Sequence, residues 1–492
     1  MRTLATLQEP DSGSAMLGDI DVLKQKDLTS VRDSPKLVYT LKRVGIYGRA
    51  LWRRLRRVLL FCAALNLAST IVFGQKTKPT AVLQVTGEHL AATDTGDRPI
   101  VEPTLAIDPA DSRHWVVAAI VALPDLSDSD CATMVTLDSG RTWERHDLHV
   151  PRCFDPWLAF VGGDEVLLAV LEKASYLRLF RSPDGGKSWL PLPQTASAVD
   201  HEMFVYRQSS DANKPDVYIV AEQDVRETIS GADASSIMIA QLSNLEEPFR
   251  SKNVFPSLLS LNAMNPVVLE DGTLLVPYVD FSRPSPTGDA PLQHGRSWLL
   301  RSVDRGQTFA PPSLISESCY RGWEWLSLDN SATSPFRGNL YYVCTGVDYQ
   351  SVLLHRSMDG GRTWAAPVSV GNSSGRARQR TPMIAVGGHG TVGISWYQDS
   401  QESDSSTQTS GCLKLFFSAS LDGGATLSNP VKVSSDPSCS SSRKNGEAGR
   451  RWPAGGDYIG LHATPDGVFH LVWSDARNGV YELWTADIKE TK

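Results

Sequence analysis

The chain has 492 residues, enough for one large core or several domains. Its 48 lysines and arginines against 55 aspartates and glutamates give a formal net charge of −7, which argues against nucleic acid or an anionic membrane surface as the partner. A hydrophobic fraction of 41% excludes wholesale disorder. The 38 glycines, 29 prolines and 13 tryptophans, with almost no long helix-forming stretch, exclude a helical bundle and predict an all-β protein.

The N-terminal part of the chain differs in composition from the rest. Residues 1–48 are polar and show no hydrophobic period, and they are absent from the product if translation starts downstream of Met1. Residues 49–74 join an arginine cluster to an apolar run at 58–73, the pattern of either a signal peptide or a membrane anchor. Both alternatives predict that residues 75–492 form a single exported domain, secreted or periplasmic. That domain contacts a membrane only if the apolar run is retained.

Six cysteines follow Cys62 of the apolar run, an even number that is typical of disulfide bonding in an exported chain. Several pairings are combinatorially open, and free buried thiols are the alternative to disulfides. Pairing of sequence neighbours would close three short loops: Cys131–Cys153, Cys319–Cys344 and Cys412–Cys439. None of the six has a C-x-x-C spacing, which disfavours structural zinc.

One short motif recurs along the chain. It combines an aspartate, a glycine, and a serine or threonine, and ends in most copies on an aromatic residue. The five copies lie at residues 137–143, 182–189, 302–309, 357–364 and 420–427. Asp and Ser/Thr side chains can bond the amides of a tight turn, and glycine supplies the positive φ that such a turn needs. We therefore expect five hairpins, each between two alternating strands.

These segments resemble the Asp boxes of the sialidase superfamily of β-propellers, and the resemblance covers roughly residues 80–490. It implies a β-propeller of four-stranded antiparallel blades with the Asp-box hairpins on the outer strands. In that superfamily the box is structural, so the repeat specifies the fold more than the function.

The strands that should line the central channel give a count of the blades. Seven segments share a polar start and an apolar alternation, and they begin at Glu102, Asp155, His201, Asn265, Glu324, Thr381 and Asp457. Seven blades are therefore favoured, with six, the number in catalytic sialidases, as the alternative. A strand at Thr80–Thr86 would close the ring by pairing into the last blade.

The polar starts of these segments predict a binding site, because a propeller binds ligands where inner-strand ends and loops converge. Aromatic faces suit sugar rings and carboxylates suit hydroxyl groups and acid/base catalysis. The substrate-binding candidates are Glu102, Asp155, Trp157, His201, Glu202, Asn265 and Trp325. The alternative is that they fill a wet channel and bond neighbouring strands.

The resemblance also implies a catalytic set: three arginines that bind the substrate carboxylate, an acidic residue, and a tyrosine nucleophile assisted by a glutamate. The matching positions are Tyr458 as nucleophile, Glu324 as its assistant, Arg98 and Arg380 as arginines of the triad, and Asp457 beside the nucleophile. Arg321 or Arg337 would complete the triad, and Asp125, Asp128 or Asp130 would supply the acid. Arg98-Pro99-Ile100 departs from the family's first arginine motif, in which Ile precedes Pro.

Together these features predict an exported glycoside hydrolase of sialidase-like type, an exo-alpha-sialidase candidate, acting on exposed glycans. The alternative is a non-catalytic propeller that binds glycan or protein at the same mouth. No dense His/Cys cluster predicts zinc, so we expect neither a metal nor another cofactor. Calcium has oxygen-rich loops available but no twelve-residue calcium-loop pattern to support it.

Overall fold

The computed structural model describes most of the chain after residue 81. The described ranges are 16–17, 20–21, 82–173, 175–198, 200–207, 216–226, 233–242, 250–257, 259–281, 295–371, 377–399 and 412–491. The chain divides into two compact units, residues 1–79 and 80–492. In the first, β1 (Met16–Leu17) pairs with β2 (Ile20–Asp21), and the predictions made for residues 1–48 and 49–74 otherwise lie outside the described residues. Within the described ranges, no helix has the length and apolar character needed to cross a membrane.

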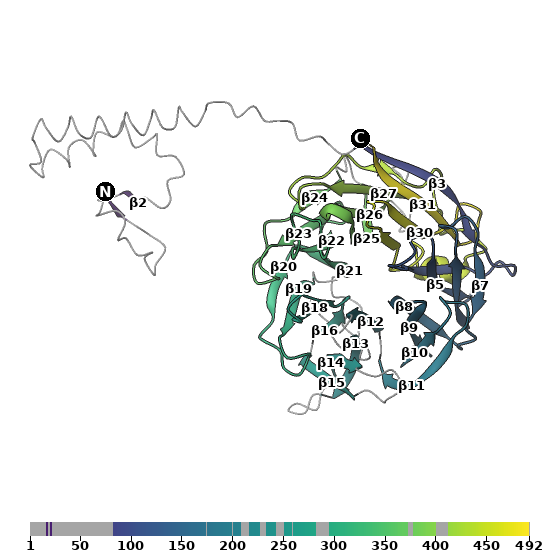
Figure 1. Ribbon diagram of the computed structural model, residues 1–492, viewed down its shortest axis with the longest axis horizontal. Helices are drawn as coiled ribbons and strands as arrows, with labels where there is room; N and C mark the ends of the chain where they lie inside the picture. The colour runs from purple at the N-terminus through teal and green to yellow at the C-terminus, as the bar shows by residue number, and fades with distance from the viewer. Residues whose placement is uncertain are drawn as a thin grey trace, which may run out of the picture. The chain divides into compact units, whose positions relative to one another are not determined.

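The second unit is a seven-bladed β-propeller of antiparallel blades, which confirms the predicted fold class and the favoured blade number (Figure 1). From the channel outwards, the first three blades are β4 (Ile100–Ile107), β5 (Trp115–Ala122), β6 (Ser129–Thr136) and β7 (Glu144–Asp147); β8 (Cys153–Gly162), β9 (Glu165–Glu172), β10 (Tyr176–Ser182) and β11 (Leu190–Ser197); and β12 (Asp200–Arg207), β13 (Asp216–Arg226), β14 (Asp233–Leu242) and β15 (Arg250–Ser257).

The next three blades follow in chain order. They are β16 (Ser260–Ala263) with β17 (Val267–Val268), β18 (Leu274–Phe281), β19 (Arg296–Ser302) and β20 (Ser313–Ser316); β21 (Cys319–Leu328), β22 (Leu340–Gly346), β23 (Val352–Ser357) and β24 (Val368–Val370); and β25 (Gln379–Val386), β26 (Val392–Asp399), β27 (Leu413–Ser420) and β28 (Val431–Lys432). Two short helices, η2 (Gly388–Gly390) and α3 (Gly446–Arg451), lie in loops.

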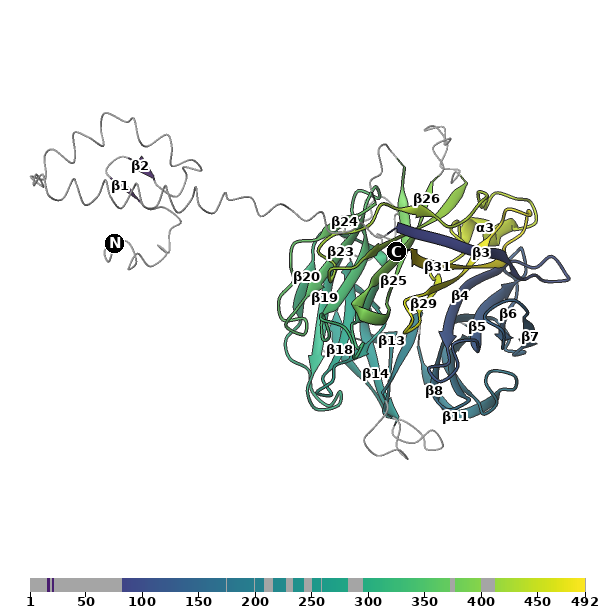
Figure 2. The ribbon, with the colours of Figure 1, turned by 45° about the horizontal axis from the view of Figure 1, so that its top comes forward.

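The last blade joins the two ends of the propeller. Its first three strands are β29 (Gly460–Ala463), β30 (Phe469–Asp475) and β31 (Glu482–Thr491). Its outermost strand is β3 (Val82–Ala92), which pairs antiparallel to β31 (Figure 2). The predicted closure of the ring is confirmed, and the closing strand is longer than the segment expected from the sequence. Main-chain hydrogen bonds between residues hundreds of positions apart therefore hold the ring together.

The core lies between the blades, against the second strand of each. All eight residues of β5 are buried, as are all seven of β22 and of β30. Strands covered on both faces read as continuous apolar runs rather than as an alternation, because neither face meets water.

Each of the five repeated segments lies between the third and fourth strands of its blade, as predicted. In the fifth blade, Asp359 Oδ1 accepts the amide of Thr363 at 2.9 Å and the hydroxyl of Ser357 at 2.8 Å, while Oδ2 accepts the Thr363 hydroxyl at 2.6 Å. Gly361, with φ of 83°, donates its amide to Ser357 Oγ at 2.8 Å. The side chains of Ser357 and Asp359 thus accept main-chain amides of the turn that have no partner on a neighbouring strand.

Replacement of this aspartate tests its contribution to the turn. Asp359→Ala is expected to lower the free energy of unfolding by about 1–3 kcal/mol, because several hydrogen bonds of the turn lose their acceptor. The proposed site chemistry should be unchanged, since the turn lies at the opposite end of the blade from the inner-strand starts. Denaturant unfolding measures the loss, and Glu490→Ala, at an exposed position of β31, is the control that should leave stability within experimental error.

All three predicted disulfides form: Cys131–Cys153, Cys319–Cys344 and Cys412–Cys439. The first joins β6 of one blade to β8 of the next, and the second joins β21 to β22 within a blade. Each disulfide joins two cysteines that are consecutive among the six, which is the pairing that the sequence favoured.

Candidate functional site: a carboxyl cluster

The inner strands share a local distortion near their first residues. The antiparallel register shifts between Val101 and Thr104 in β4 and between Phe154 and Trp157 in β8, and equivalent shifts occur in β12, β21 and β25. Four non-glycine residues there adopt positive φ angles of 49–56°: Glu102, Asp155, His201 and Thr381. Left-handed backbone is unfavourable for such residues and concentrates at functional sites, where bulges re-aim side chains.

Six acidic side chains lie near these distorted starts, and we call Glu102, Asp155, Asp200, Glu202, Glu222 and Asp457 the carboxyl cluster. Glu102 and Glu202 are buried, whereas the Asp200 side chain is 48% exposed. The Asp457 amide donates to Glu102 Oε1 at 3.2 Å. The Glu102 and Asp155 side chains hydrogen-bond to each other, and so do those of Asp155 and Asp200. At the edge of the cluster, Glu222 Oε1 accepts the Ser235 hydroxyl at 2.9 Å. Two carboxyl groups can hydrogen-bond to each other only while one of them holds a proton, so Glu102 and Asp155 share at least one.

The surroundings of the cluster favour the protonated acids. Burial raises the pKa of Glu102 to about 8, and the charge of Asp457 adds to this effect. Burial also raises the pKa of Asp155 well above its usual range, with the charges of Asp200 and Glu102 as further causes. The pKa of Glu222 rises to about 7, again mainly through burial. At neutral pH the cluster therefore contains carboxylic acids that can donate protons.

His201 is the buried imidazole of the cluster. Burial alone would lower the pKa of this imidazole, but the charges of Asp200, Asp155 and Asp457 outweigh it and raise the pKa. Its position follows from the register of β12, where the bulge separates it from the paired residues on β13.

Aromatic rings adjoin the cluster on the channel side. Trp157 and Trp325, from blades on opposite parts of the ring, stack with centroids 5.6 Å apart and planes 1° apart. Tyr458 meets both rings edge-on at 6.4 and 5.6 Å. Burial and the charges of Asp155, Glu102 and Glu202 raise the Tyr458 pKa well above its usual range. The Tyr458 phenol is therefore neutral. The two indole rings stack on each other, so their facing sides are in mutual contact.

The structure gives Glu324 a different neighbourhood from the one predicted. This carboxyl is fully buried on β21, and its charge acts on the pKa of Tyr342, a residue of the adjacent strand β22. The acids that act most on Tyr458 are those of the carboxyl cluster instead. The pairing of Tyr458 with Glu324 stays a prediction.

The predicted arginines are each bonded to a protein carboxylate. Arg98 donates from Nε and Nη2 to Asp94, which also accepts from Arg145 at 2.8 Å. Arg380 Nη2 donates to Asp399 Oδ1 at 2.7 Å, and both side chains are largely buried. Each of the two arginines therefore has a different aspartate as its ion-pair partner, and their place in a common triad stays a prediction.

The remaining arginine and acid candidates lie elsewhere. Arg337 pairs with Glu270 at the far mouth of the channel, and the side chain of Arg321 lies outside the described part of the structure. The three loop aspartates accept main-chain amides of their own region: Asp125 from Ser127, Asp128 from Ser129 and Arg152, and Asp130 from Val150. The three aspartates therefore stabilise loops near the starts of the inner strands, at the end of the channel opposite Arg337.

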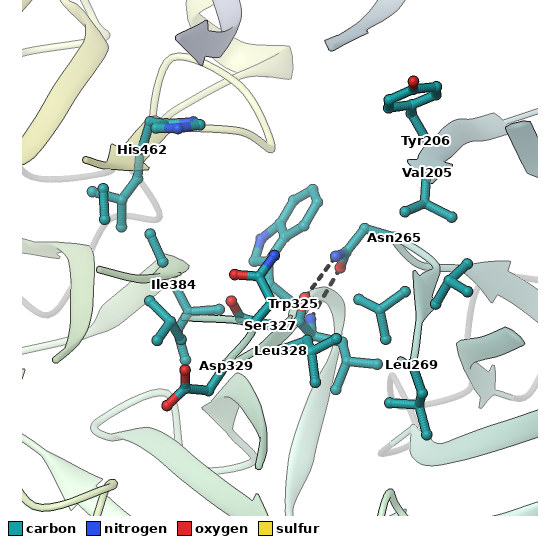
Figure 3. Close-up of a pocket in the computed structure, with 18 of the residues that line it drawn as sticks. Val205, Tyr206, Asn265, Leu269, Trp325, Ser327, Leu328, Asp329, Ile384 and His462 are labelled. Atoms are coloured by element: carbon teal, nitrogen blue, oxygen red, sulfur yellow. Dashed lines mark hydrogen bonds between the residues drawn. The ribbon is translucent and has the colours of Figure 1, made fainter. Parts of the chain in front are cut away.

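Asn265 belongs to a separate feature, a cavity of about 1180 Å³ among the later residues of the inner strands. Its side chain donates to the Leu326 carbonyl at 2.7 Å and accepts the Leu326 amide at 3.0 Å, which joins two blades (Figure 3). Trp157 and Trp325 line this cavity as well as contacting Tyr458. The stacked indoles thus lie between the carboxyl cluster and the cavity, and the predicted substrate-binding residues divide between two places.

Within the described residues, two groups of side chains offer three ligand atoms close enough for one metal ion. They are Cys319, Cys344 and His355, in which both sulfurs belong to a disulfide, and Asp108, His114 and Asp164. The carboxyl cluster is not such a group. Its acceptors are spread too widely to converge on a single ion.

Two members of the cluster were missed in the sequence. Asp200 directly precedes His201, and Glu222 lies opposite Asp200 in the β12–β13 ladder. Only the pairing register identifies Glu222, because it belongs to a second strand and the prediction considered first strands alone.

No protein-family profile matches the sequence, and no curated protein matches it. Solved structures that it resembles include a protein of unknown function from Dyadobacter fermentans, with 12% identity, a TM-score of 0.47, and coverage of 83% of this chain and 99% of that one. A Hadza microbial sialidase has 13% identity and a TM-score of 0.42, with coverage of 82% of this chain and 68% of that one. An α-L-arabinofuranosidase of Fusarium graminearum has 9% identity and a TM-score of 0.43, with coverage of 82% of this chain and 98% of that one. Similarities this low assign no activity, and the blade count rests on the strand pairing of the chain itself.

Proposed function

We propose that this chain is an exported glycoside hydrolase whose acid/base groups are Glu102 and Asp155 of the carboxyl cluster. The observation that carries the proposal is their mutual hydrogen bond in a buried site, with the Glu102 pKa raised to about 8. Glycoside hydrolysis uses one protonated and one ionised carboxyl about 5–9.5 Å apart, so this pair must open to admit a sugar and close again after the product leaves. The left-handed backbone at both residues supports a functional origin of the arrangement.

The reaction follows from the two protonation states of this pair. Glu102 gives its proton to the glycosidic oxygen as the bond from that oxygen to the anomeric carbon breaks. Because the two acids share one proton, Asp155 is ionised while Glu102 holds it, and Asp155 takes a proton from the attacking water, whose oxygen bonds to the anomeric carbon. The proton then returns from Asp155 to Glu102 along their hydrogen bond, and the net change is the addition of one water molecule.

The narrower version of this proposal is an exo-alpha-sialidase with Tyr458 as nucleophile. It requires arginines that face the substrate carboxylate, whereas Arg98 and Arg380 are bonded to Asp94 and Asp399. The geometry therefore favours a glycosidase that relies on carboxyl groups over the sialidase version.

Turnover of a panel of fluorogenic glycosides by the purified chain tests the proposal. The panel contains neutral pyranosides, an α-L-arabinofuranoside, amino-sugar glycosides and a sialoside. Hydrolysis of a non-anionic member that is lost in Asp155→Asn supports the carboxyl mechanism. Hydrolysis of the sialoside that is lost in Tyr458→Phe would establish the sialidase version instead.

A non-catalytic binding propeller is the second candidate, and the cavity of about 1180 Å³ at the far mouth favours it. A folded protein that hydrolyses no member of the panel but binds glycans in an array would select this candidate. In that case, Asp155→Asn should leave binding at the cavity unchanged, because Asp155 does not line it.

A further inference from the structure

Three side chains from the first two blades meet at the ends of the inner strands that lie opposite the carboxyl cluster. Asp108 directly follows β4, His114 directly precedes β5, and Asp164 lies in the turn between β8 and β9. Each residue offers one ligand atom, and these three atoms all lie within 4.8 Å of one another. Loops of neighbouring blades therefore bring one imidazole and two carboxylates together.

The hydrogen bonds of His114 determine which ring nitrogen is available to a ligand. Nε2 lies 2.9 Å from the Gly185 carbonyl oxygen, which can only accept, so this nitrogen carries a proton and donates it. An imidazole that binds a metal donates its other N–H in the same way, which fixes the tautomer and the orientation of the ring. Phe160 meets the ring edge-on at 5.1 Å. Nδ1 is therefore the nitrogen that faces Asp108.

His114 Nδ1 and Asp108 Oδ2 are two buried atoms that face each other without a hydrogen bond. They lie 3.5 Å apart, and their side chains are only 7% and 6% exposed. Asp108 Oδ1 accepts the Ala110 amide at 2.7 Å, which orients the carboxylate and leaves Oδ2 without a donor among the described residues. Two facing acceptors are unfavourable when buried, unless a cation lies between them. That cation is either a proton on Nδ1 or a metal ion.

The separation of these two atoms favours a metal ion over a proton. A charge-assisted hydrogen bond between a nitrogen and a carboxylate oxygen is about 2.7–2.9 Å long. His470 Nδ1 and Asp487 Oδ1, in the last blade, have this spacing, at 2.7 Å. By contrast, two ligand atoms that are each about 2.0–2.1 Å from a tetrahedral ion lie about 3.4 Å apart. The 3.5 Å between His114 and Asp108 matches the second geometry.

Asp164 supplies the third ligand and the opening to solvent. Its side chain is exposed and makes no hydrogen bond to the described residues, so it can turn toward the other two. An imidazole among the ligands indicates zinc, because calcium and magnesium prefer oxygen ligands alone. Three protein ligands leave the fourth position of the tetrahedron to water.

We propose that Asp108, His114 and Asp164 bind one zinc ion, which ties the first blade of the propeller to the second. The site is independent of the function proposed above, because the carboxyl cluster lies at the opposite ends of these strands. The proposal departs from the expectation of no metal. That expectation rested on the lack of a dense His/Cys cluster in the sequence, whereas these ligands come from separate loops.

Zinc titration of the purified, untagged chain after treatment with a chelator tests the proposal. Calorimetry at pH 7.5 gives the number of ions and the dissociation constant, and we expect one zinc ion per chain. The melting temperature should rise with zinc and fall again with EDTA, because the ion binds the folded state. Calcium and manganese are the comparison ions, and both should bind at least about tenfold more weakly than zinc.

Two matched variants locate the ion. Asp164→Asn keeps the shape of an exposed side chain but removes a charged ligand, and it should weaken zinc binding by about tenfold or more. Asp466→Asn is the control, since Asp466 is an exposed aspartate in the corresponding turn of the last blade, between β29 and β30. It should bind zinc as the native chain does. Circular dichroism and the melting temperature without zinc check that both variants fold.

Each result supports or overturns the zinc site. One zinc ion per chain, bound more weakly by Asp164→Asn and equally well by Asp466→Asn, supports it. A native chain that binds no zinc overturns it and leaves a proton between His114 and Asp108. Zinc binding that is unchanged in folded Asp164→Asn places the ion elsewhere and also overturns the proposal. Tighter binding of calcium or manganese than of zinc overturns the choice of metal.

Discussion

Glu102→Gln is expected to reduce turnover by about 10²–10⁴-fold, the usual contribution of a general acid, because an amide cannot protonate the leaving oxygen. The side chain keeps its shape, and its carbonyl oxygen can still accept the Asp457 amide, which donates to Glu102 at 3.2 Å in the native protein. The measurement is kcat on the glycoside that the native protein hydrolyses fastest. Glu165→Gln, which loses an ion pair with Arg181 at the partly exposed β9–β10 hairpin, is the control expected to retain kcat.

The same variant should be more stable than the native protein in mild alkali. The folded-state pKa of Glu102 is raised to about 8 from an ordinary value of 4.5, so between these values the folded chain holds a proton that the unfolded chain releases. The stabilisation is therefore fully present in acid, and it falls by about 1.4 kcal/mol for each pH step of one across this window. Glutamine removes that dependence.

Denaturant unfolding at pH 5 and pH 8 measures this effect. The difference in unfolding free energy between the variant and the native protein should grow in favour of the variant by several kcal/mol from pH 5 to pH 8. A difference that is the same at both pH values would show that Glu102 does not hold its proton in the folded state. Lost turnover with no pH-dependent gain would then reflect a disturbed site.

Gly456→Ala is expected to disrupt the site and to destabilise the fold by several kcal/mol. Gly456 has a φ of 123°, a conformation that residues with a Cβ rarely adopt. An added Cβ would lie 2.2 Å from Glu102 Cγ and 2.8 Å from the Glu102 amide nitrogen. Since a backbone atom cannot rotate away, the first and last blades would have to separate at this contact.

The measurements for this variant are the melting temperature and, where the variant folds, kcat. Gly467→Ala is the matched control: its φ is also positive, at 83°, but no atom lies within 4 Å of the added Cβ. It should cost about 1 kcal/mol of backbone strain and leave kcat unchanged. Equal losses in the two variants would mean that backbone strain alone, and not the contact with Glu102, accounts for the effect.

The fold could be predicted because its signals are local. Each repeated turn is completed within about eight residues, as the bonds of Asp359 to Ser357 and Thr363 show, so its sequence is sufficient to identify it. Cysteines that are consecutive among the six, 22–27 residues apart, also paired as expected, with their Cα atoms 4.3–5.7 Å apart. Repetition of the polar inner-strand starts then supplied the number of blades.

The candidate site could be predicted only in part. The polar starts identified Glu102, Asp155 and Glu202, because equivalent positions of different blades meet around one channel. The sequence does not show that Arg98 faces Asp94 or that Arg380 faces Asp399, because the partner of a charged side chain depends on distance in space. The same holds for Glu222, which reaches the cluster through the register of a ladder.

The sequence by itself therefore determined the propeller, its blade number, the closing strand and the disulfide pairs, all of which depend on short-range patterns or on their repetition. Tertiary structure alone decided which acids share one buried space and which arginines are already neutralised. It also separated the carboxyl cluster from the cavity that Asn265 lines. The physical reason is that pKa values and charge pairing follow burial and distance, and ring closure sets both between residues that are far apart in the chain.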